Sequence, residues 1–323
     1  MTDWKLSIAD EIVANNHTGK GVALAAFFMG SMGLIAATLS ACMVVFIAPP
    51  AEASGLPQLI VYMAEAELME ERKALELGNR LLEFRVVLVK IFALTLACFS
   101  GLAIGREGPA VHIGAGFGWI VAKCVISDVE KHGVVRPGDP DHPLAVTEGG
   151  LVHTLVVAGG AAGFAAAFNA PLGGMLYMLE EIALPSGWSA RATRGSFVAA
   201  ASAVLIVKGV LQLAWSDSSV SYNSIVIFEK GTSIDTLGWS FSDIIPFLLL
   251  GALCGVVSGI ATHLGLMMQK YRKSAAWRVE SNWKKVVEIS LVALATSVIF
   301  TILPAMYRVC VDVPADGDDD TNR

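Results

Sequence analysis

The sequence predicts an all-α protein that crosses a membrane several times, and three observations support this fold class. First, 54% of the 323 residues are hydrophobic and only 16% are charged, whereas about 25% of the residues in soluble domains are charged. Second, the mean hydropathy is +0.61, and several apolar runs reach the roughly 20 residues that a membrane-crossing helix needs. Third, shorter apolar runs in the middle of the chain are interrupted by glycine and proline.

Five long apolar runs are predicted to form membrane-crossing helices. They occur near residues 21–48, 84–104, 195–215, 243–269 and 286–310. The first run begins near Lys20 and is too long for the apolar core of a signal peptide, so no cleavable signal is expected.

Three shorter apolar runs lie between the second and third long runs, near residues 109–125, 151–167 and 171–184. They are separated by the pentapeptide GREGP, a polar loop over 127–149 and the tripeptide Asn-Ala-Pro at 169–171. Transporter folds use such interrupted segments where half-helices meet a binding site near the membrane midplane. We therefore expect this region to contain the functional site of the protein.

The connecting segments are more polar. The stretch 59–83 is amphipathic and rich in charge, and is predicted to be a helical connector at the membrane interface. Segments 127–143 and 216–241 are expected to be aqueous loops because proline, glycine and polar residues punctuate them. The linker 270–285 is rich in lysine and arginine, which places it on the cytoplasmic side by the positive-inside rule.

These features predict three regions along the chain. A polar N-terminal segment covers residues 1–20, a partial membrane domain covers 21–310, and a tail covers 311–323. Five aspartates in the last region indicate a solvated, disordered end.

Several function classes find no support in the sequence. The five cysteines lie far apart, which argues against a disulfide framework or a zinc site. No Ser/His/Asp arrangement, metal-ligand spacing or phosphate-binding GxxxxGK(S/T) motif occurs. The chain is therefore not expected to be an enzyme or to need a cofactor or metal ion. Membrane lipid is an expected partner and nucleic acid is not.

The pentapeptide GREGP has the features of an anion site at a helix N-terminus. Proline is favoured in the first turn of a helix, so Pro109 predicts that a helix begins here. Gly105 and Gly108 allow backbone amides to approach a ligand closely. The unpaired N–H groups and partial positive charge of a helix N-terminus attract anions.

Glu107 would lie at this positive end, where its own carboxylate can occupy the anion position. It could then leave on protonation or when an anion displaces it. Ionisable residues inside a membrane are functional candidates by default. The alternative is that Arg106 and Glu107 simply pair with each other or form a turn at the membrane interface.

Two further stretches carry polar groups between apolar runs. In ASGLPQ, Ser54 offers a hydroxyl, Gly55 a permissive backbone and Pro57 a helix start, although an ordinary serine-glycine turn would look the same. Residues 159–182 are rich in glycine and alanine, which lets membrane helices approach closely. This second stretch ends in a pair of glutamates, of which one can face the interior and carry a proton, or the pair can cap the helix at the interface.

The order of these motifs resembles the CLC family of chloride channels and chloride/proton exchangers. That family has the pattern GSGIP, then G(K/R)EGP, then GxAAAFNAPLxGxLFxxEE, and this chain has SGLP, GREGP and GFAAAFNAPLGGMLYMLEE over a match of roughly 21–310. The resemblance implies an all-helical membrane domain, here the first inverted repeat and the start of the second. It also implies chloride as the substrate and, in most members, a homodimer with one anion pathway per subunit.

The resemblance assigns roles to individual residues of the anion site. Ser54 matches the serine whose hydroxyl coordinates the central anion, with Gly55 beside it. Glu107 matches the gating glutamate that competes with chloride and relays a proton. Arg106 and Gly108 flank it and present backbone around the anion.

Two more residues are assigned in the same way. Lys90 matches a lysine that adds positive potential near the pathway. Glu181 falls where exchangers keep a glutamate for proton transfer that channels lack, which favours a chloride/proton exchanger over a voltage-gated channel.

The chain departs from the family pattern in three ways. Ala53 stands where the pattern has glycine, and Gln58 where it usually has glutamate. Only twenty residues precede the run 21–48, where the family normally has another long helix. No GxFxP motif of the second half follows the run 286–310. Two expectations stay open: a transporter of chloride and protons, or a truncated or split half that transports nothing alone and needs a complementing C-terminal half.

Overall fold

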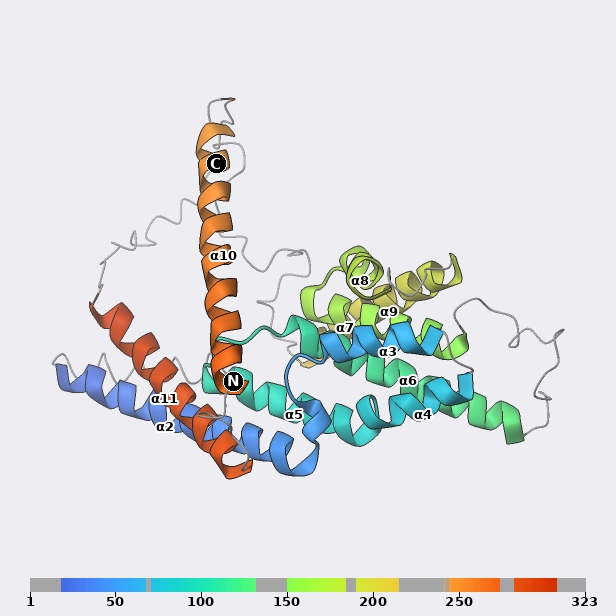
Figure 1. The fold of residues 1–323 in the computed structure, drawn as a ribbon, viewed down its shortest axis with the longest axis horizontal. Helices are drawn as coiled ribbons and strands as arrows, with labels where there is room; N and C mark the ends of the chain where they lie inside the picture. The colour runs from blue at the N-terminus through green and yellow to red at the C-terminus, as the bar shows by residue number, and fades with distance from the viewer. Residues whose placement is uncertain are drawn as a thin grey trace, which may run out of the picture. The chain divides into compact units, whose positions relative to one another are not determined.

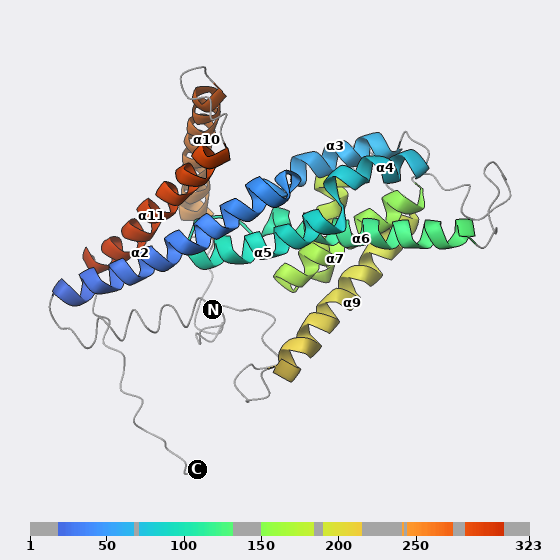
Figure 2. The same ribbon diagram turned by 90° about the horizontal axis from the view of Figure 1, so that it is seen from below.

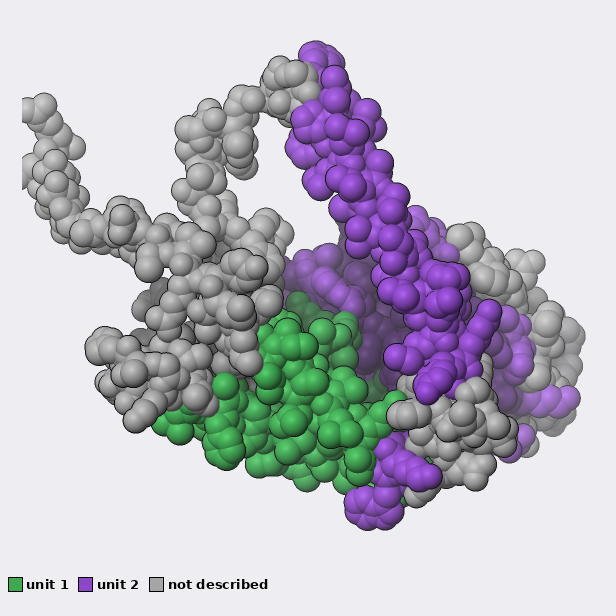
Figure 3. Space-filling model, turned by 60° about the vertical axis from the view of Figure 1, so that its left-hand side comes forward, with its two compact units in different colours: residues 1–52, 88–106, 286–323 green, residues 53–87, 107–285 purple. Residues whose placement is uncertain are grey.

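The computed structural model describes residues 19–67, 71–131, 150–183, 190–214, 241, 244–273 and 282–306. These residues form helices and no strands (Figure 1), which confirms the predicted all-α class. The predicted tail and most of the predicted loops lie outside them. The chain divides into two compact units, shown in Figure 3. Unit 1 comprises residues 1–52, 88–106 and 286–323, and unit 2 comprises 53–87 and 107–285.

Unit 1 contains helix α2 and most of helices α5 and α11. Their bounds are Gly19–Cys42, Phe84–Ser100 and Asn282–Met306, and α2 continues through a π-helical turn, η1 (Met43–Ile47), and a 3-10 turn, η2 (Pro49–Ala51). The Ser40 hydroxyl donates a hydrogen bond to the Ala93 carbonyl oxygen at 2.8 Å. Thr38 and Ser290 share a hydrogen bond of 2.8 Å between their hydroxyl groups. Polar side chains therefore tie α2 to both of its neighbours.

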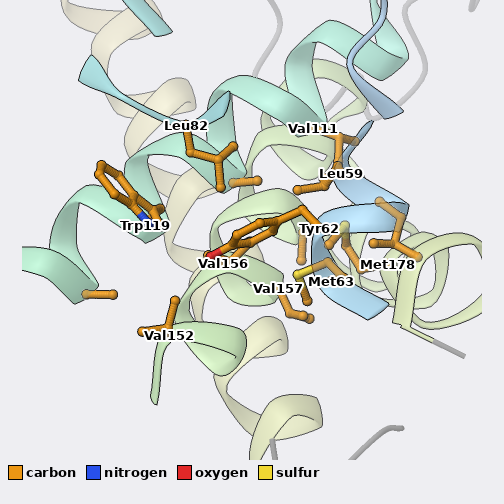
Figure 4. Packing of buried hydrophobic residues seen from close by; sticks show 14 of the residues in the cluster. Leu59, Tyr62, Met63, Leu82, Val111, Trp119, Val152, Val156, Val157 and Met178 are labelled. Atoms are coloured by element: carbon orange, nitrogen blue, oxygen red, sulfur yellow. The ribbon is translucent and has the colours of Figure 1, made fainter. Parts of the chain in front are cut away.

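Unit 2 is built around helix α7. Its elements are α3 (Leu56–Glu67), α4 (Glu71–Leu81), α6 (Glu107–Lys131), α7 (Leu151–Phe168), α8 (Pro171–Tyr177), η3 (Met178–Ala183), α9 (Ala190–Ala214) and α10 (Ile244–Lys273). Helix α7 packs against α6 and α9 (Figure 2), and it also packs against α8. The hydrophobic core of unit 2 consists of buried side chains from several helices (Figure 4). Fully buried members from α3, α6, α7 and η3 include Leu59, Met63, Val111, Val156 and Met178.

Within the described residues each of the five long apolar runs forms a helix, but only the runs near 21–48, 195–215 and 243–269 contain a candidate membrane span. Among the described residues, five helical stretches are long and apolar enough to cross a membrane. They are Leu24–Ile47, Glu107–Asp128, Leu151–Phe168, Ala192–Leu211 and Ile244–Tyr271. The run predicted near 84–104 gives the shorter α5, of 17 residues, and the connector 59–83 contains two helices, α3 and α4.

One predicted boundary is wrong. The short run near 109–125 is part of α6, which has 25 residues and continues to Lys131, into the segment expected to be a loop. The physical reason is local: no glycine or proline occurs between Gly118 and Gly133 to stop the helix. The expected break at 169–171 is confirmed, because Asn169 has φ 56° and ends α7 in the left-handed region.

The predicted close approach of glycine-bearing helices is confirmed between α6 and α7. A Cβ atom on Gly114 would collide with the carbonyl oxygen of Gly159, and one on Gly118 with that of Leu155. A Cβ atom on Gly163 would collide with the carbonyl oxygen of Ala110. The two helices therefore touch backbone to backbone, which only glycine permits.

Candidate functional site

The SGLP motif and the last three residues of GREGP, 107–109, meet in unit 2, although they lie far apart in the sequence. Helix α3 begins at Leu56 and helix α6 begins at Glu107. A Cβ atom on Gly108 would lie 2.7 Å from the Ser54 Cβ and 3.1 Å from the Leu56 Cδ1, so the two helix starts are in van der Waals contact. Each start exposes backbone N–H groups that have no partner within its own helix. Two positive helix ends therefore converge at this contact.

The backbone around Ser54 is sharply turned. Gly55 has φ 82°, and the residue before Ser54, Ala53, has φ 58°. The Ser54 Oγ accepts a hydrogen bond from the Leu56 N–H at 3.4 Å, and the Gly55 carbonyl accepts one from Leu59 at 2.9 Å. Ser54 is half-buried, so its hydroxyl stays at the start of α3 with one side accessible.

Arg106 and Glu107 are both exposed. Glu107 is the first residue of α6, with Gly108 buried beside it and Pro109 completing the first turn, as the sequence predicts. A carboxylate in this position is stabilised by the positive end of the helix. Arg106 lies in unit 1 and Glu107 in unit 2, so the boundary between the two units passes through the motif.

The paired glutamates lie in η3, a single π-helical turn that follows α8. Such turns are rare and frequently mark functional sites. Within the described chain, Glu180 and Glu181 are both exposed.

Tyr177 is a residue that the sequence reasoning missed. It is the last residue of α8, outside the five candidate membrane spans. Partial burial and the charges of Glu181 and Glu107 all raise the pKa of its hydroxyl. The signal in the sequence was a tyrosine where the quoted family pattern has phenylalanine.

Lys90 is the one predicted site residue on helix α5. It lies on α5 in unit 1 and is only 3% exposed. In the described part of the chain its Nζ has no hydrogen-bond partner. A buried ammonium group of this kind favours a nearby anion.

The described residues contain no group of three or more His, Cys, Asp or Glu side chains that could hold a metal ion. The four cysteines within the described ranges are free: Cys42, Cys98, Cys124 and Cys254. Unit 2 thus brings the starts of α3 and α6 and the Ser54 side chain into contact, with Glu107 as the first residue of α6.

Comparison with known proteins gives consistent similarities. Residues 32–314 match the family described as voltage gated chloride channel. The chain is 29% identical over 284 residues to chloride channel protein D of Dictyostelium discoideum, covering 85% of this chain and 25% of that protein. It is 26% identical over 322 residues to chloride channel protein CLC-d of Arabidopsis thaliana, covering 98% of this chain and 37% of that protein. It is 25% identical over 251 residues to the anion/proton exchange transporter GEF1 of Saccharomyces cerevisiae, covering 77% and 28%. The chain thus spans between a quarter and two fifths of the length of these relatives.

Proposed function

Because this chain belongs to the voltage gated chloride channel family, we propose that the contact between Ser54 and Gly108 forms one side of a chloride-transport site. The chain is an integral membrane protein, and its relatives are named as channels and transporters rather than enzymes. The observation that carries the proposal is the convergence of two helix starts at a glycine with no room for a side chain.

A chloride ion leaving water loses its hydration shell, and an uncompensated buried charge is expensive. The first turns of α3 and α6 offer backbone N–H groups, the Ser54 hydroxyl offers one more donor, and both helix ends add positive potential. A complete shell around the ion would need further donors beside these.

Glu107 supplies the competitor for the ion. Its carboxylate stands at the N-terminus of α6, where a chloride ion would be stabilised by the same N–H groups. Carboxylate and chloride exclude each other there, and protonation of Glu107 favours the anion. This competition couples anion occupancy to the proton concentration.

Glu181 supports proton-coupled exchange over a passive channel. It stands in the π-helical turn after α8, and its charge acts on the same tyrosine as that of Glu107. The relatives include both chloride channel proteins and an anion/proton exchange transporter, so their names are compatible with either mode.

A second candidate function is a partial subunit that transports nothing alone. The observation that favours it is the coverage: the chain matches 25% of one relative and 37% of another. In this case a second copy of the chain would not suffice, and a complementing C-terminal half would supply the missing anion donors.

The test is chloride and proton flux from liposomes that contain the purified chain, alone and together with the unmatched remainder of a relative. We expect Glu107→Ala to retain chloride flux and lose proton coupling, because the competing carboxylate is gone. The exposed Glu76 on α4 provides a matched control, Glu76→Ala, which should behave as the wild type.

A glycine pair tests the geometry of the site in the same assay. Gly108→Ala adds a methyl group 2.7 Å from the Ser54 Cβ and should reduce chloride flux. Gly195→Ala on α9 meets only the Thr154 Cγ2 at 3.8 Å and should leave flux unchanged. Chloride flux that appears only when the unmatched remainder of a relative is present would support the partial-subunit function. Absence of chloride flux both with and without that remainder would contradict the transport proposal.

A further inference from the structure

We propose that the hydroxyl group of Tyr177 is a proton-relay station between Glu181 and Glu107. This inference rests on the proposed proton-coupled transport and adds to it a residue that neither the sequence motifs nor the relatives' names assign. Four observations within unit 2 support this inference.

The first observation is its position relative to Glu181. Helix α8 passes into the π-helical turn η3 without a break, because Met178 has helical φ −65° and ψ −36°. Tyr177 and Glu181 are therefore four residues apart on a continuous helical segment, where side chains at i and i+4 lie on the same face.

The second observation is how the start of α6 meets the end of α8. A Cβ atom on Gly160 of α7 would lie 2.7 Å from the Met178 Cε and 3.4 Å from the Val111 Cγ1. Met178 directly follows Tyr177, and Val111 lies one turn after Glu107. The two ends that carry Tyr177 and Glu107 thus pack against the same point of α7.

The third observation is that the ring of Tyr177 is held in place. It stacks on Phe164 of α7 with a centroid separation of 4.5 Å and an interplanar angle of 18°. Phe164 in turn contacts Phe168 with a centroid separation of 4.6 Å. Since Tyr177 is only half-buried, its ring is fixed while its hydroxyl remains reachable.

The fourth observation is electrostatic and agrees with this placement. Besides burial, the two charges that raise the pKa of the Tyr177 hydroxyl are those of Glu181 and Glu107. Carboxylates raise a phenol pKa by disfavouring the phenolate, and this effect falls with distance. Both carboxylates are therefore close enough to act on the same oxygen atom.

The transfer step follows from the chemistry of a hydroxyl group, which both donates and accepts a hydrogen bond. The protonated Glu181 gives its proton to the Tyr177 oxygen, directly or through water, while the original phenolic proton passes to the Glu107 carboxylate. One O–H bond breaks at Glu181 and one forms at Glu107, and the phenol is regenerated. Phenylalanine, which the family pattern has at this position, offers no such atom.

The transport test compares Tyr177→Phe with Tyr62→Phe in liposomes that contain the wild-type or variant chain. Tyr62 is the matched control, because its hydroxyl donates to the Ala74 carbonyl oxygen at 3.2 Å and serves the packing of α3 on α4. We expect Tyr177→Phe to lower proton flux severalfold with chloride flux unchanged, and Tyr62→Phe to leave the proton-to-chloride ratio unchanged. An unchanged ratio in Tyr177→Phe would overturn the relay.

A second measurement does not depend on transport. The phenol ionisation of Tyr177 is followed in the detergent-solubilised chain by the difference between each protein and its Tyr177→Phe counterpart. Glu181→Gln and Glu107→Gln should each lower the pKa of Tyr177, since each removes a negative charge. If neither does, the relay is wrong even when chloride flux is present. Loss of chloride flux in every arrangement, by contrast, counts against the proposed function, and the titration still decides whether the two carboxylates share this hydroxyl.

Discussion

Ala53 adopts a backbone conformation that normally favours glycine. Its φ of 58° lies in the left-handed region, directly before the Ser54 hydroxyl and the equally left-handed Gly55. An alanine in this conformation is strained by contact of its Cβ with the backbone. The family pattern has glycine here, so this departure leaves the turn of the backbone unchanged and adds strain to it.

Ala53→Gly should therefore stabilise the chain. Relief of the left-handed conformation contributes about 1–2 kcal/mol, and the extra freedom of glycine in the unfolded state offsets roughly 0.4–1 kcal/mol of it. We expect a net rise in the thermal unfolding midpoint in detergent.

The matched control is Ala51→Gly. Ala51 is buried and ends the 3-10 turn η2, so its substitution removes a buried methyl group without relieving strain and should lower the midpoint. Equal destabilisation by both substitutions would show that Ala53 is not strained.

At the scale of helices, the sequence predicted starts better than ends or contacts. Pro57 and Pro109 mark the beginnings of α3 and α6, because proline has no N–H group of its own to leave unpaired and its fixed φ suits the first turn. The sequence placed the end of α6 too early. The apolar run ends near residue 125, but the polar residues that follow still favour a helix, which continues to Lys131. The contact of Ser54 with Gly108 could not be derived from spacing, since it depends on how α3 and α6 pack within unit 2.

The same limit applies to Tyr177. Its type was visible in the sequence, but its relation to Glu107 arises only when α6 and η3 pack against α7. The assignment of Ser54, Glu107 and Glu181 came from the family pattern and remains a proposal, whereas the helical class followed from hydrophobicity alone and is confirmed.

The α6–α7 contact makes a prediction at this scale. Gly118→Ala places a methyl group against the Leu155 carbonyl oxygen, which belongs to the backbone and cannot change rotamer. We expect a loss of about 1–3 kcal/mol in stability, the usual cost of overpacking, measured as a lower unfolding midpoint in detergent.

Gly255→Ala on α10 is the matched control, because a Cβ atom there meets nothing within 4 Å. Alanine at this open position should be neutral or gain up to about 1 kcal/mol from helix propensity. If Gly118→Ala were as well tolerated as Gly255→Ala, the backbone contact would not hold α6 against α7.

At the scale of the whole molecule, the apolar surface of α10 determines the topology. Ile244–Tyr271 is a candidate span of 28 residues that is 0% buried against the described chain. An exposed apolar surface of this length requires lipid or other membrane helices around it. Helix α10 should therefore cross the membrane once.

This crossing predicts that segments 216–241 and 270–285 lie on opposite sides of the membrane, with 270–285 cytoplasmic because of its basic residues. A glycosylation sequon inserted into 216–241 should be modified in microsomes, whereas one inserted into 270–285 should not. Modification at both positions would mean that α10 does not cross, and modification at 270–285 alone would reverse the orientation.

The seam of glycines between α6 and α7 has a mechanical consequence. Interfaces made of side chains absorb small displacements by changing rotamers, but a carbonyl oxygen resting on a glycine Cα has no rotamer to change. Helices α6 and α7 are therefore expected to move together as one rigid body. A displacement of one helix is passed to the other directly through the backbone.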